Sequence, residues 1–301
     1  MKNTKKIGQD SISRIIVGSV LVLYTLIFLF LMYWAITTAF KTQKELTLQE
    51  NYFGLPQEWQ WENLKTAASF FAMKDVVRNG RTIAEIPFAT QILYTLLYAG
   101  GCAIVHTLSP ILVAYATSRF AYRFNKALDI IVLITMIVPI VGTQSSMVSL
   151  LVDLNIYDTY LGLYAQKFFF VDMYYFVFVA VFKGVSSSYY EAAEIDGASE
   201  WTIMIKVAFP LILSSAGLVL LLHFMRLWND YTTLMIYAPS HPSIALGLYQ
   251  MMAGSASGSS AKGQTPVLLS GCIMIVIPVM ILFIIFRNKL MGNLTIGGVK
   301  E

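Results

Sequence analysis

This sequence has little charge, few cysteines and no phosphate-binding loop. Charged residues make up 13% of its 301 residues, about half the roughly 25% that is usual in soluble domains. Cys102 and Cys272 each stand in an apolar run, so we expect two small core residues rather than a disulfide framework or a metal site. The net charge of +4 is too small to indicate nucleic-acid binding. Because no Gly-x4-Gly-Lys-Ser/Thr loop occurs, we expect this chain to bind no nucleotide.

Apolar residues, in contrast, are abundant. They make up 57% of the chain, and the mean hydropathy is +0.65. No globular shape hides that much apolar surface from water, so the natural solvent of the chain is a lipid bilayer. Apolar runs of about 20 residues or more predict an all-α polytopic membrane protein with six transmembrane helices, at residues 15–40, 89–117, 127–151, 161–182, 211–237 and 267–286. The fourth run is the weakest because Lys167 and Asp172 lie within it.

The positions of lysine and arginine predict the orientation of these spans. Basic residues gather in residues 1–14, in the segment between the second and third spans (which contains Arg119 and Arg123), and in residues 287–301. With six spans, all three segments lie on one side. We therefore expect a basic cytoplasmic N-terminus at 1–14, a membrane domain at 15–286 and a cytoplasmic tail at 287–301. The first apolar run is too long for a cleaved signal peptide and reads as an uncleaved anchor.

The loop between the fourth and fifth spans is long and acidic, although it lies on the predicted inner side. Residues 186–210 read SSSYYEAAEIDGASEWTIMIKVAFP. Ser186 and Ser199 can cap two short helices, with acidic residues in their first turns. Gly197 can adopt the left-handed conformation that ends the first helix, and Pro210 either ends the second or marks the start of the fifth span. The pattern predicts a helical knob that projects from the membrane.

The same loop carries a resemblance to a known family. Its motif consists of Glu191-Ala192-Ala193, Asp196-Gly197-Ala198 and the ending Val207-Ala208-Phe209-Pro210. It resembles the EAA loop of permease subunits of ATP-binding-cassette importers, in particular those for carbohydrates. The family's usual ending is Ile-x-Leu-Pro, so Val207 and Phe209 are conservative departures. Trp228-Asn229-Asp230 and residues 294–300 also resemble sugar permeases, and the whole chain is most similar to the second permease of maltose-type importers.

The resemblance implies a six-helix permease domain at 15–286, with a cytoplasmic coupling-helix (EAA) loop at 186–210 between helices 4 and 5. It implies contact with an ATPase subunit through Glu191, Ala192, Ala193, Asp196, Gly197 and Pro210. Ala192 and Ala193 have little bulk, so a partner can approach the backbone closely. The resemblance also implies a second ATPase contact through the tail residues Gly297, Gly298 and Lys300. A disordered basic tail that only sets membrane orientation is the alternative.

The resemblance further implies the partners and the location. These are a second permease subunit (a different chain rather than another copy), two ATPase subunits that bind ATP and Mg, and an extracytoplasmic sugar-binding protein. The chain itself would bind no cofactor and catalyse no reaction. It would lie as a multi-pass protein in the lipid bilayer of the bacterial cytoplasmic membrane, with both termini cytoplasmic. No nucleic-acid partner is expected.

Charged and aromatic residues near the end of the fifth span are candidates for a solute pathway. Arg226 and Asp230 are four residues apart, which places them on one helix face, either in a pathway or in a structural ion pair. Trp228, Asn229 and Tyr231 complete this candidate set. His106 and His223 each stand alone in the sequence, with no second histidine or carboxylate at metal spacing. We therefore expect core histidines and no metal site.

Three other functions are considered against the leading interpretation. The chain can be the permease of an importer for a non-sugar solute. An ATP-independent secondary transporter or channel would need a buried proton or sodium relay, and no convincing chain of carboxylates occurs. A membrane-embedded enzyme would need paired catalytic groups at membrane depth, which the sequence does not contain.

Overall fold

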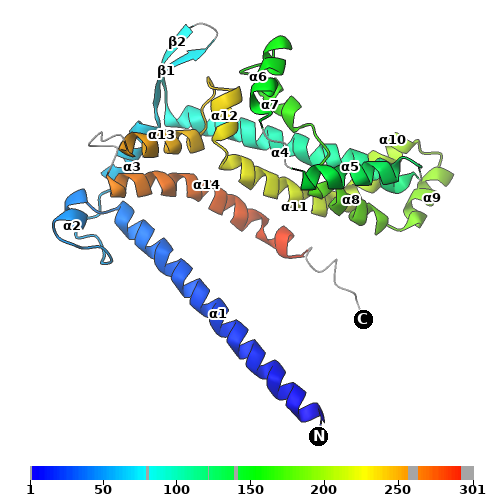
Figure 1. Cartoon of the computed structure of the whole chain (residues 1–301), viewed down its shortest axis with the longest axis horizontal. Coiled ribbons are helices and arrows are strands. Elements are labelled where there is room, and N and C mark those ends of the chain that lie inside the picture. Colours follow the sequence, from blue (N-terminus) through cyan, green and yellow to red (C-terminus); the bar gives the residue numbers. More distant parts are fainter. Residues whose placement is uncertain (1, 79–80, 121, 139–141, 257–263, 293–301) are drawn as a thin grey trace. The chain divides into compact units, whose positions relative to one another are not determined.

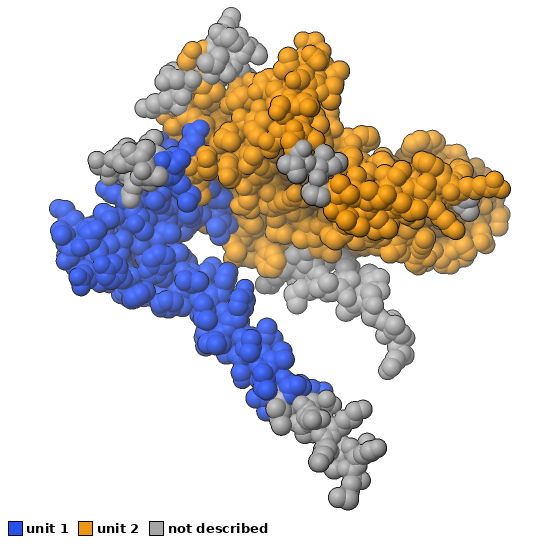
Figure 2. Space-filling model, viewed as in Figure 1, with its two compact units in different colours: residues 1–70, 250–276 blue, residues 71–249, 277–301 orange. Residues whose placement is uncertain are grey.

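The computed structural model describes residues 2–78, 81–120, 122–138, 142–256 and 264–292 (Figure 1). It divides into two compact units, Met1–Phe70 with Gln250–Val276 and Phe71–Tyr249 with Ile277–Glu301 (Figure 2). The tail residues Gly297, Gly298 and Lys300, which the sequence analysis singles out, lie outside the described residues.

Four helical stretches in the described residues are long and apolar enough to cross a membrane. They are Ser13–Ala39 in α1 (Lys2–Ala39), Phe88–Arg119 forming α4, Glu200–Trp228 ending in α11 (Phe209–Trp228), and Thr265–Phe286 in α14 (Thr265–Gly292). These stretches correspond to the first, second, fifth and sixth predicted spans. The chain is therefore a mostly helical protein of membrane type.

The third predicted span, residues 127–151, is not one helix. It consists of α5 (Asn125–Ile137) and α6 (Gln144–Asp153). Val138 is extended, with φ −87° and ψ 109°, as expected for a residue that precedes a proline. Gly142 has a positive φ of 84°. The expectation of a continuous helix is wrong because counting apolar residues ignores this break in the backbone.

The fourth and fifth predicted spans are also interrupted. Residues 161–182 contain α7 (Tyr160–Lys167) and α8 (Met173–Lys183), because Asp172 caps α8 by accepting a 2.7 Å hydrogen bond from the backbone N–H of Tyr174. Residues 211–237 contain the end of α11 and then α12 (Thr232–Tyr237). Polar capping residues inside an apolar run thus decide where these helices begin and end.

A two-stranded antiparallel hairpin corrects the expectation of an all-α chain. Strand β1 (Met73–Arg78) pairs with β2 (Arg81–Ile86), with Met73 opposite Ile86 and Arg78 opposite Arg81. The two residues between the strands in the sequence are Asn79-Gly80, a dipeptide that strongly favours hairpins. A search for long apolar runs does not detect it.

A compact loop follows α1 and includes α2 (Gln43–Thr47), before α3 (Glu62–Phe71). We refer to residues 41–63 as the α2 loop. Lys41 is fully buried, and its ammonium donates to the backbone carbonyl of Asn51 at 2.7 Å. Thr42 and Glu45 form a capping box at the start of α2. The side-chain amide of Asn63 donates to the backbone carbonyls of Ala39 and Lys41, each at 2.8 Å. These bonds close the C-terminal end of α1.

Each unit has its own apolar core. In the first unit, Ala67, Met251 and Val267 are buried together, and Met251 lies on α13 (Ile244–Ala256). In the second unit, α4 packs against α7, α8 and α11, and aromatic side chains of α8 such as Tyr175 and Phe178 are fully buried. Cys102 is a buried free thiol and Cys272 is a half-buried one, which confirms the prediction for Cys102. The α4–α8–α11 core supports the segment described next.

Candidate functional site

Residues 186–210, which we name the elbow, contain α9 (Ser187–Ile195), α10 (Glu200–Ile203) and η1 (Met204–Ala208), a π-helix. The predicted caps are confirmed, because the hydroxyl of Ser186 accepts from the N–H of Ser188 and that of Ser199 from the N–H of Thr202. Glu200 lies in the first turn of α10, as predicted. The first turn of α9 holds no acidic residue, so that expectation is wrong for Glu191.

Gly197 ends α9 in the left-handed conformation, with φ +78°. Its N–H donates to the carbonyl of Glu194, and the N–H of Ala198 donates to the carbonyl of Ala193, both at 3.0 Å. This pair of bonds is a Schellman motif. An added Cβ at Gly197 would meet no heavy atom within 4 Å. Glycine is therefore required by the backbone conformation and not by lack of space.

The second helix of the elbow runs without a break into α11. The π-helix η1 joins α10 to α11, and Pro210 lies in the first turn of α11, where it lacks the N–H that would donate to a carbonyl of the preceding turn. Of the two interpretations of Pro210, the start of the fifth span is therefore correct. Single π-helical turns inside α-helices are frequent at functional sites.

The outer surface of the elbow combines acidic and large apolar side chains. Glu191, Glu194 and Asp196 are exposed. Ile195 is 86% exposed and Trp201 is 71% exposed. These two residues were not among the predicted contact residues, although a tryptophan and an isoleucine in a loop predicted to lie outside the bilayer could have identified them. Exposed apolar side chains surrounded by polar ones are typical of protein–protein contacts.

Arg119, at the end of α4, holds both helices of the elbow. Its guanidinium forms an ion pair with Glu194 of α9 and lies 3.5 Å from a carboxylate oxygen of Glu200 on α10. It also stacks over the ring of Tyr190, 4.9 Å from the centroid. One turn earlier, the hydroxyl of Tyr115 donates to Glu200 at 3.2 Å. The last turn of α4 therefore ties the elbow to a membrane-type helix.

Burial and a neighbouring charge both act on the pKa of Tyr190 in this contact. Burial raises the pKa of the Tyr190 hydroxyl, and the positive charge of Arg119 offsets part of that rise. The sequence analysis used Arg119 only to predict orientation. Nothing local in the sequence links it to Glu194 or Glu200, because the three residues come from different helices.

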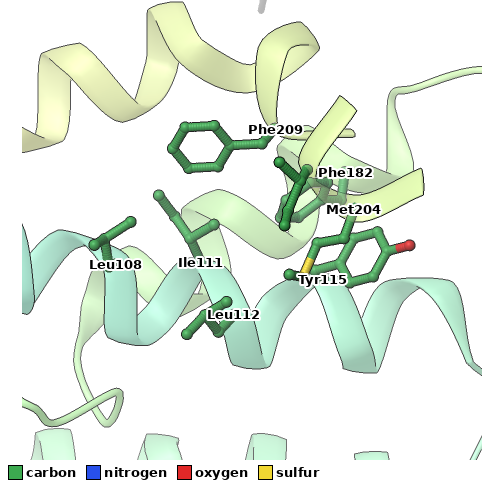
Figure 3. A pocket seen from close by; sticks show the side chains of 8 residues that line it. Leu108, Ile111, Leu112, Tyr115, Phe182, Met204 and Phe209 are labelled. Atoms are coloured by element: carbon green, nitrogen blue, oxygen red, sulfur yellow. The ribbon is translucent and has the colours of Figure 1, made fainter. Parts of the chain in front are cut away.

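An apolar pocket of about 240 Å³ lies beside the π-helix. Figure 3 shows its lining side chains, which come from α4, α8, η1 and α11. They are Leu108, Ile111, Leu112, Tyr115, Phe182, Met204, Ile205 and Phe209.

The candidate pathway residues do not form one group. Trp228 is fully buried and contacts the ring of Phe224, whereas Arg226 and Asn229 are exposed. Tyr231 stacks on Tyr249, with ring centroids 4.4 Å apart. The burial of Trp228 makes it a packing residue in this chain.

The expectation that Arg226 and Asp230 share one helix face is wrong, because α11 ends at Trp228. Asp230 instead accepts hydrogen bonds from the hydroxyl of Tyr98 at 2.7 Å and from the N–H of Thr233 at 3.1 Å. Asp230 therefore joins α4 to the start of α12, and the ion pair that the spacing suggested is replaced by these bonds.

His106 and His223, which stand alone in the sequence, lie side by side in the structure. The rings of His106 on α4 and His223 on α11 stack with centroids 4.1 Å apart. Both approach the same carboxylate oxygen of Asp172, at 3.2 and 3.8 Å. The sequence could not reveal this cluster, because its members are far apart in the chain and meet only through helix packing.

A helical protein of membrane type, with an exposed elbow tied to a long apolar helix, is the class that this geometry defines. The family described as "Binding-protein-dependent transport system inner membrane component" matches residues 107–290, which is more than half of the chain and includes the elbow. The chain belongs to this family. The predicted resemblance to importer permeases is thereby confirmed.

Individual relatives are similar along most of their length. The arabinooligosaccharides transport system permease protein of Halalkalibacterium halodurans is 24% identical, over 77% of this chain and 88% of that protein. The diacetylchitobiose uptake system permease protein of Streptomyces coelicolor is 23% identical, over 93% and 86%. A crystal structure of a bacterial ABC transporter for import of the acidic polysaccharide alginate has a TM-score of 0.75 at 20% identity, covering 93% of this chain and 97% of that one, which shows a shared fold.

Proposed function

We propose that this chain is one of two permease subunits in an ATP-driven importer that takes up a sugar or oligosaccharide delivered by an extracytoplasmic binding protein. The observation that carries the proposal is the elbow, an exposed acidic and apolar surface tied to α4 within the region matched by the family. The choice of a sugar is supported by relatives named for oligosaccharide uptake along most of their length.

The elbow acts as the contact through which ATP binding is transmitted. ATP and Mg are bound by two partner ATPase subunits, and this chain contributes no cofactor site. When those subunits close, the docked elbow moves with them as a rigid body and changes the tilt of the spans. Glu191 orients the elbow by charge-assisted bonds, Ala192 and Ala193 allow close approach, and Asp196 and Gly197 form the turn at its tip.

Arg119 gives this movement a second route into the membrane domain. The chain connects the elbow covalently to α11 through η1 and Pro210. Its ion pairs connect the same elbow to α4. A displacement of the elbow therefore pulls on two helices that pack against each other.

The proposed orientation places the elbow and both termini in the cytoplasm of a bacterial cell. Six crossings of the cytoplasmic membrane result if the α5–α6 and α7–α8 segments each supply one, in addition to the four long helices. The basic residues Arg119 and Arg123 then lie on the inner side, as positive charge in short loops favours. The second permease is a different chain.

The solute passes residues near the end of α11. Arg226, Asn229, Asp230 and Tyr231 contact the pathway, while the buried Trp228 positions them. The tail residues Gly297, Gly298 and Lys300 give a further ATPase contact. Deleting residues 295–301 is expected to weaken coupling, and full coupling in that variant contradicts the tail contact.

The test is purification of the chain in mild detergent, identification of the chains that purify with it, and reconstitution in liposomes. We expect an ATPase and a second permease in the preparation, and sugar-dependent stimulation of ATP hydrolysis when the binding protein is added. Uptake that continues without the ATPase contradicts the proposal. Stimulation by a non-sugar solute alone contradicts the choice of substrate.

A further inference from the structure

Three side chains with metal-ligating atoms converge inside the second unit. His106 comes from α4, His223 from α11 and Asp172 from the N-terminus of α8. One ligand atom from each lies within 4.8 Å of the others. Two of the distances are 3.2 Å, from the Nε2 of His106 to the Oδ2 of Asp172, and 3.8 Å, from the Nε2 of His223 to the same oxygen. Ligand atoms around one tetrahedral zinc ion lie roughly 3.4 Å apart.

One of these atoms has no hydrogen-bond partner. Only 2% of the surface of His223 is exposed, and its Nε2 makes no hydrogen bond to any of the described residues. A buried polar atom without a partner is costly and requires an explanation. This Nε2 lies 3.8 Å from the Oδ2 of Asp172, so a cation between the two atoms would supply the missing partner.

Neighbouring groups fix which atoms face this point. The hydroxyl of Thr107 lies 3.1 Å from the Nδ1 of His223, so Nε2 is the nitrogen left to face the cluster. The Oδ1 of Asp172 accepts from the N–H of Tyr174, so Oδ2 is the oxygen that faces both histidines. Hydrogen bonds of this kind orient the ligands in metal sites.

We propose that His106, Asp172 and His223 form a binding site for a divalent transition-metal cation. Two imidazoles and one carboxylate suit zinc and similar ions better than magnesium or calcium, which favour oxygen ligands. Three protein ligands leave a coordination position open. The inference does not depend on the proposed transport function, because it concerns binding by this chain alone.

The arrangement of the rings predicts which side chain moves when the ion binds. The two imidazole planes are 10° from parallel, and an ion in the plane of one ring is then outside the plane of the other. One ring must rotate. His106, whose side chain is 17% exposed against 3% for His223, is the ring with room to do so.

Charge makes Asp172 the decisive ligand. Asp172 is the one negatively charged group of the three, whereas each imidazole binds a cation as a neutral ligand. We therefore expect Asp172→Asn to weaken binding more than the loss of either histidine.

The experiment uses the full chain, purified in detergent with its bound partners through a tag that contains no histidine, and stripped of metal. Zinc binding is measured by calorimetry, and the visible absorption of added Co²⁺ reports histidine and carboxylate coordination. The variants are His106→Gln, Asp172→Asn and His223→Gln. The matched control is His241→Gln, which removes the third of the chain's three histidines. This histidine is buried outside the cluster, and its Nδ1 lies 3.1 Å from the hydroxyl of Ser240 and 3.4 Å from a carboxylate oxygen of Asp158.

One zinc ion per chain is expected in the wild type and in His241→Gln. In each of the three ligand variants, zinc affinity should fall by more than the 10- to 100-fold that is typical when a residue supporting a ligand is changed. In Thr107→Val, which removes such a supporting residue, zinc affinity should fall by an amount within that range. Retention of the monodisperse complex shows that a variant has folded. Absence of zinc binding in the wild type overturns the proposal, and so does binding that is insensitive to all three ligand variants or equally sensitive to His241→Gln.

Discussion

The elbow and the α2 loop use their charged residues in opposite ways. In the α2 loop, Lys41 is fully buried and Glu45 is only 3% exposed. Both make hydrogen bonds within the loop. In the elbow, the acidic residues are exposed, and the large apolar residues Ile195 and Trp201 are exposed beside them.

The difference separates two buried charges that stabilise their own loop from an exposed acidic and apolar surface that a partner can cover. Burying a charge is costly unless hydrogen bonds or an opposite charge compensate it, so Lys41 and Glu45 are committed to the structure of the α2 loop. Exposed apolar side chains outside the spans remain in water until another protein covers them. The following predictions test this contrast, from the largest expected effect to the smallest.

The largest effect is expected at Ile195 and Trp201, the exposed apolar side chains of the elbow. Replacing Ile195 and Trp201 together by alanine should weaken binding of the purified ATPase subunit by roughly 1,000-fold, because each apolar anchor that the partner covers contributes about 2 kcal/mol. Binding is measured by surface plasmon resonance on the reconstituted chain. Leu48→Ala is the matched control, since Leu48 is 76% exposed but lies in the α2 loop. Equal losses of ATPase binding in the two variants contradict the assignment of Ile195 and Trp201 to the docking surface.

The second effect concerns Arg119, which ties the elbow to α4. Arg119→Gln should lower sugar uptake per ATP hydrolysed about tenfold. The expected free-energy change is about 1.4 kcal/mol, from two partly exposed ion pairs and one cation–π contact. Proteoliposomes give uptake and hydrolysis together. Arg123→Gln, which removes an exposed arginine near the end of the same helix, should leave the ratio unchanged.

Exchanging the two charges of the ion pair distinguishes loss of the specific contact between Arg119 and Glu194 from a general effect of removing a charge. In Arg119→Glu with Glu194→Arg, the ion pair can form in reverse, so coupling should partly recover relative to Arg119→Glu alone. An unchanged ratio in Arg119→Gln, or no recovery in the double variant, shows that α4 is not the second route of transmission.

Sequence reasoning succeeded where structure is decided within a few residues. The caps Ser186 and Ser199 and the turn at Gly197 depend on bonds to residues two to five positions away, and all three follow from residue type. The apolar runs located four long helices but not their interruptions. Asp172 was noted as a charge in a span, although its capping role is what ends the continuous helix.

Long-range contacts were beyond the reach of the sequence. Arg119 meets Glu194, and His106 meets His223, only because α4 packs against α8 and α11. Side-chain spacing along one helix gives no information about such contacts. The spacing was misleading for Arg226 and Asp230, because a shared face requires one continuous helix and α11 ends before Asp230.

The third effect tests the buried charges of the α2 loop. Burial raises the pKa of Glu45, but hydrogen bonds from Gln57, Thr42 and Asn51 and the charge of Lys41 outweigh it and hold the pKa below its ordinary value of 4.5. The carboxylate therefore stabilises the fold at pH values above about 4.5, and this contribution is lost as the pH falls through the lowered pKa.

Glu45→Gln should accordingly reduce stability by about 1.5 kcal/mol at neutral pH, the scale of a hydrogen bond to a charged group. The difference from the wild type should shrink as the pH falls below about 4.5. Thermal unfolding in detergent across this pH range measures it. Glu58→Gln, an exposed change in the same loop, is the control. A difference that stays constant with pH shows that the charge of Glu45 does not stabilise the loop.

The smallest effect concerns the backbone conformation of the elbow at Gly197 and not the contacts of its side chains. Gly197→Val places a side chain in open space but forces a left-handed conformation, at a cost of about 1 kcal/mol. ATPase binding should fall roughly fivefold, although Ile195 and Trp201 are unchanged. Gly197→Asn should retain most of the binding, because asparagine tolerates this conformation better than valine. If both variants lose binding equally, added bulk rather than conformation is responsible, and the docked partner must then lie against the backbone of the turn itself.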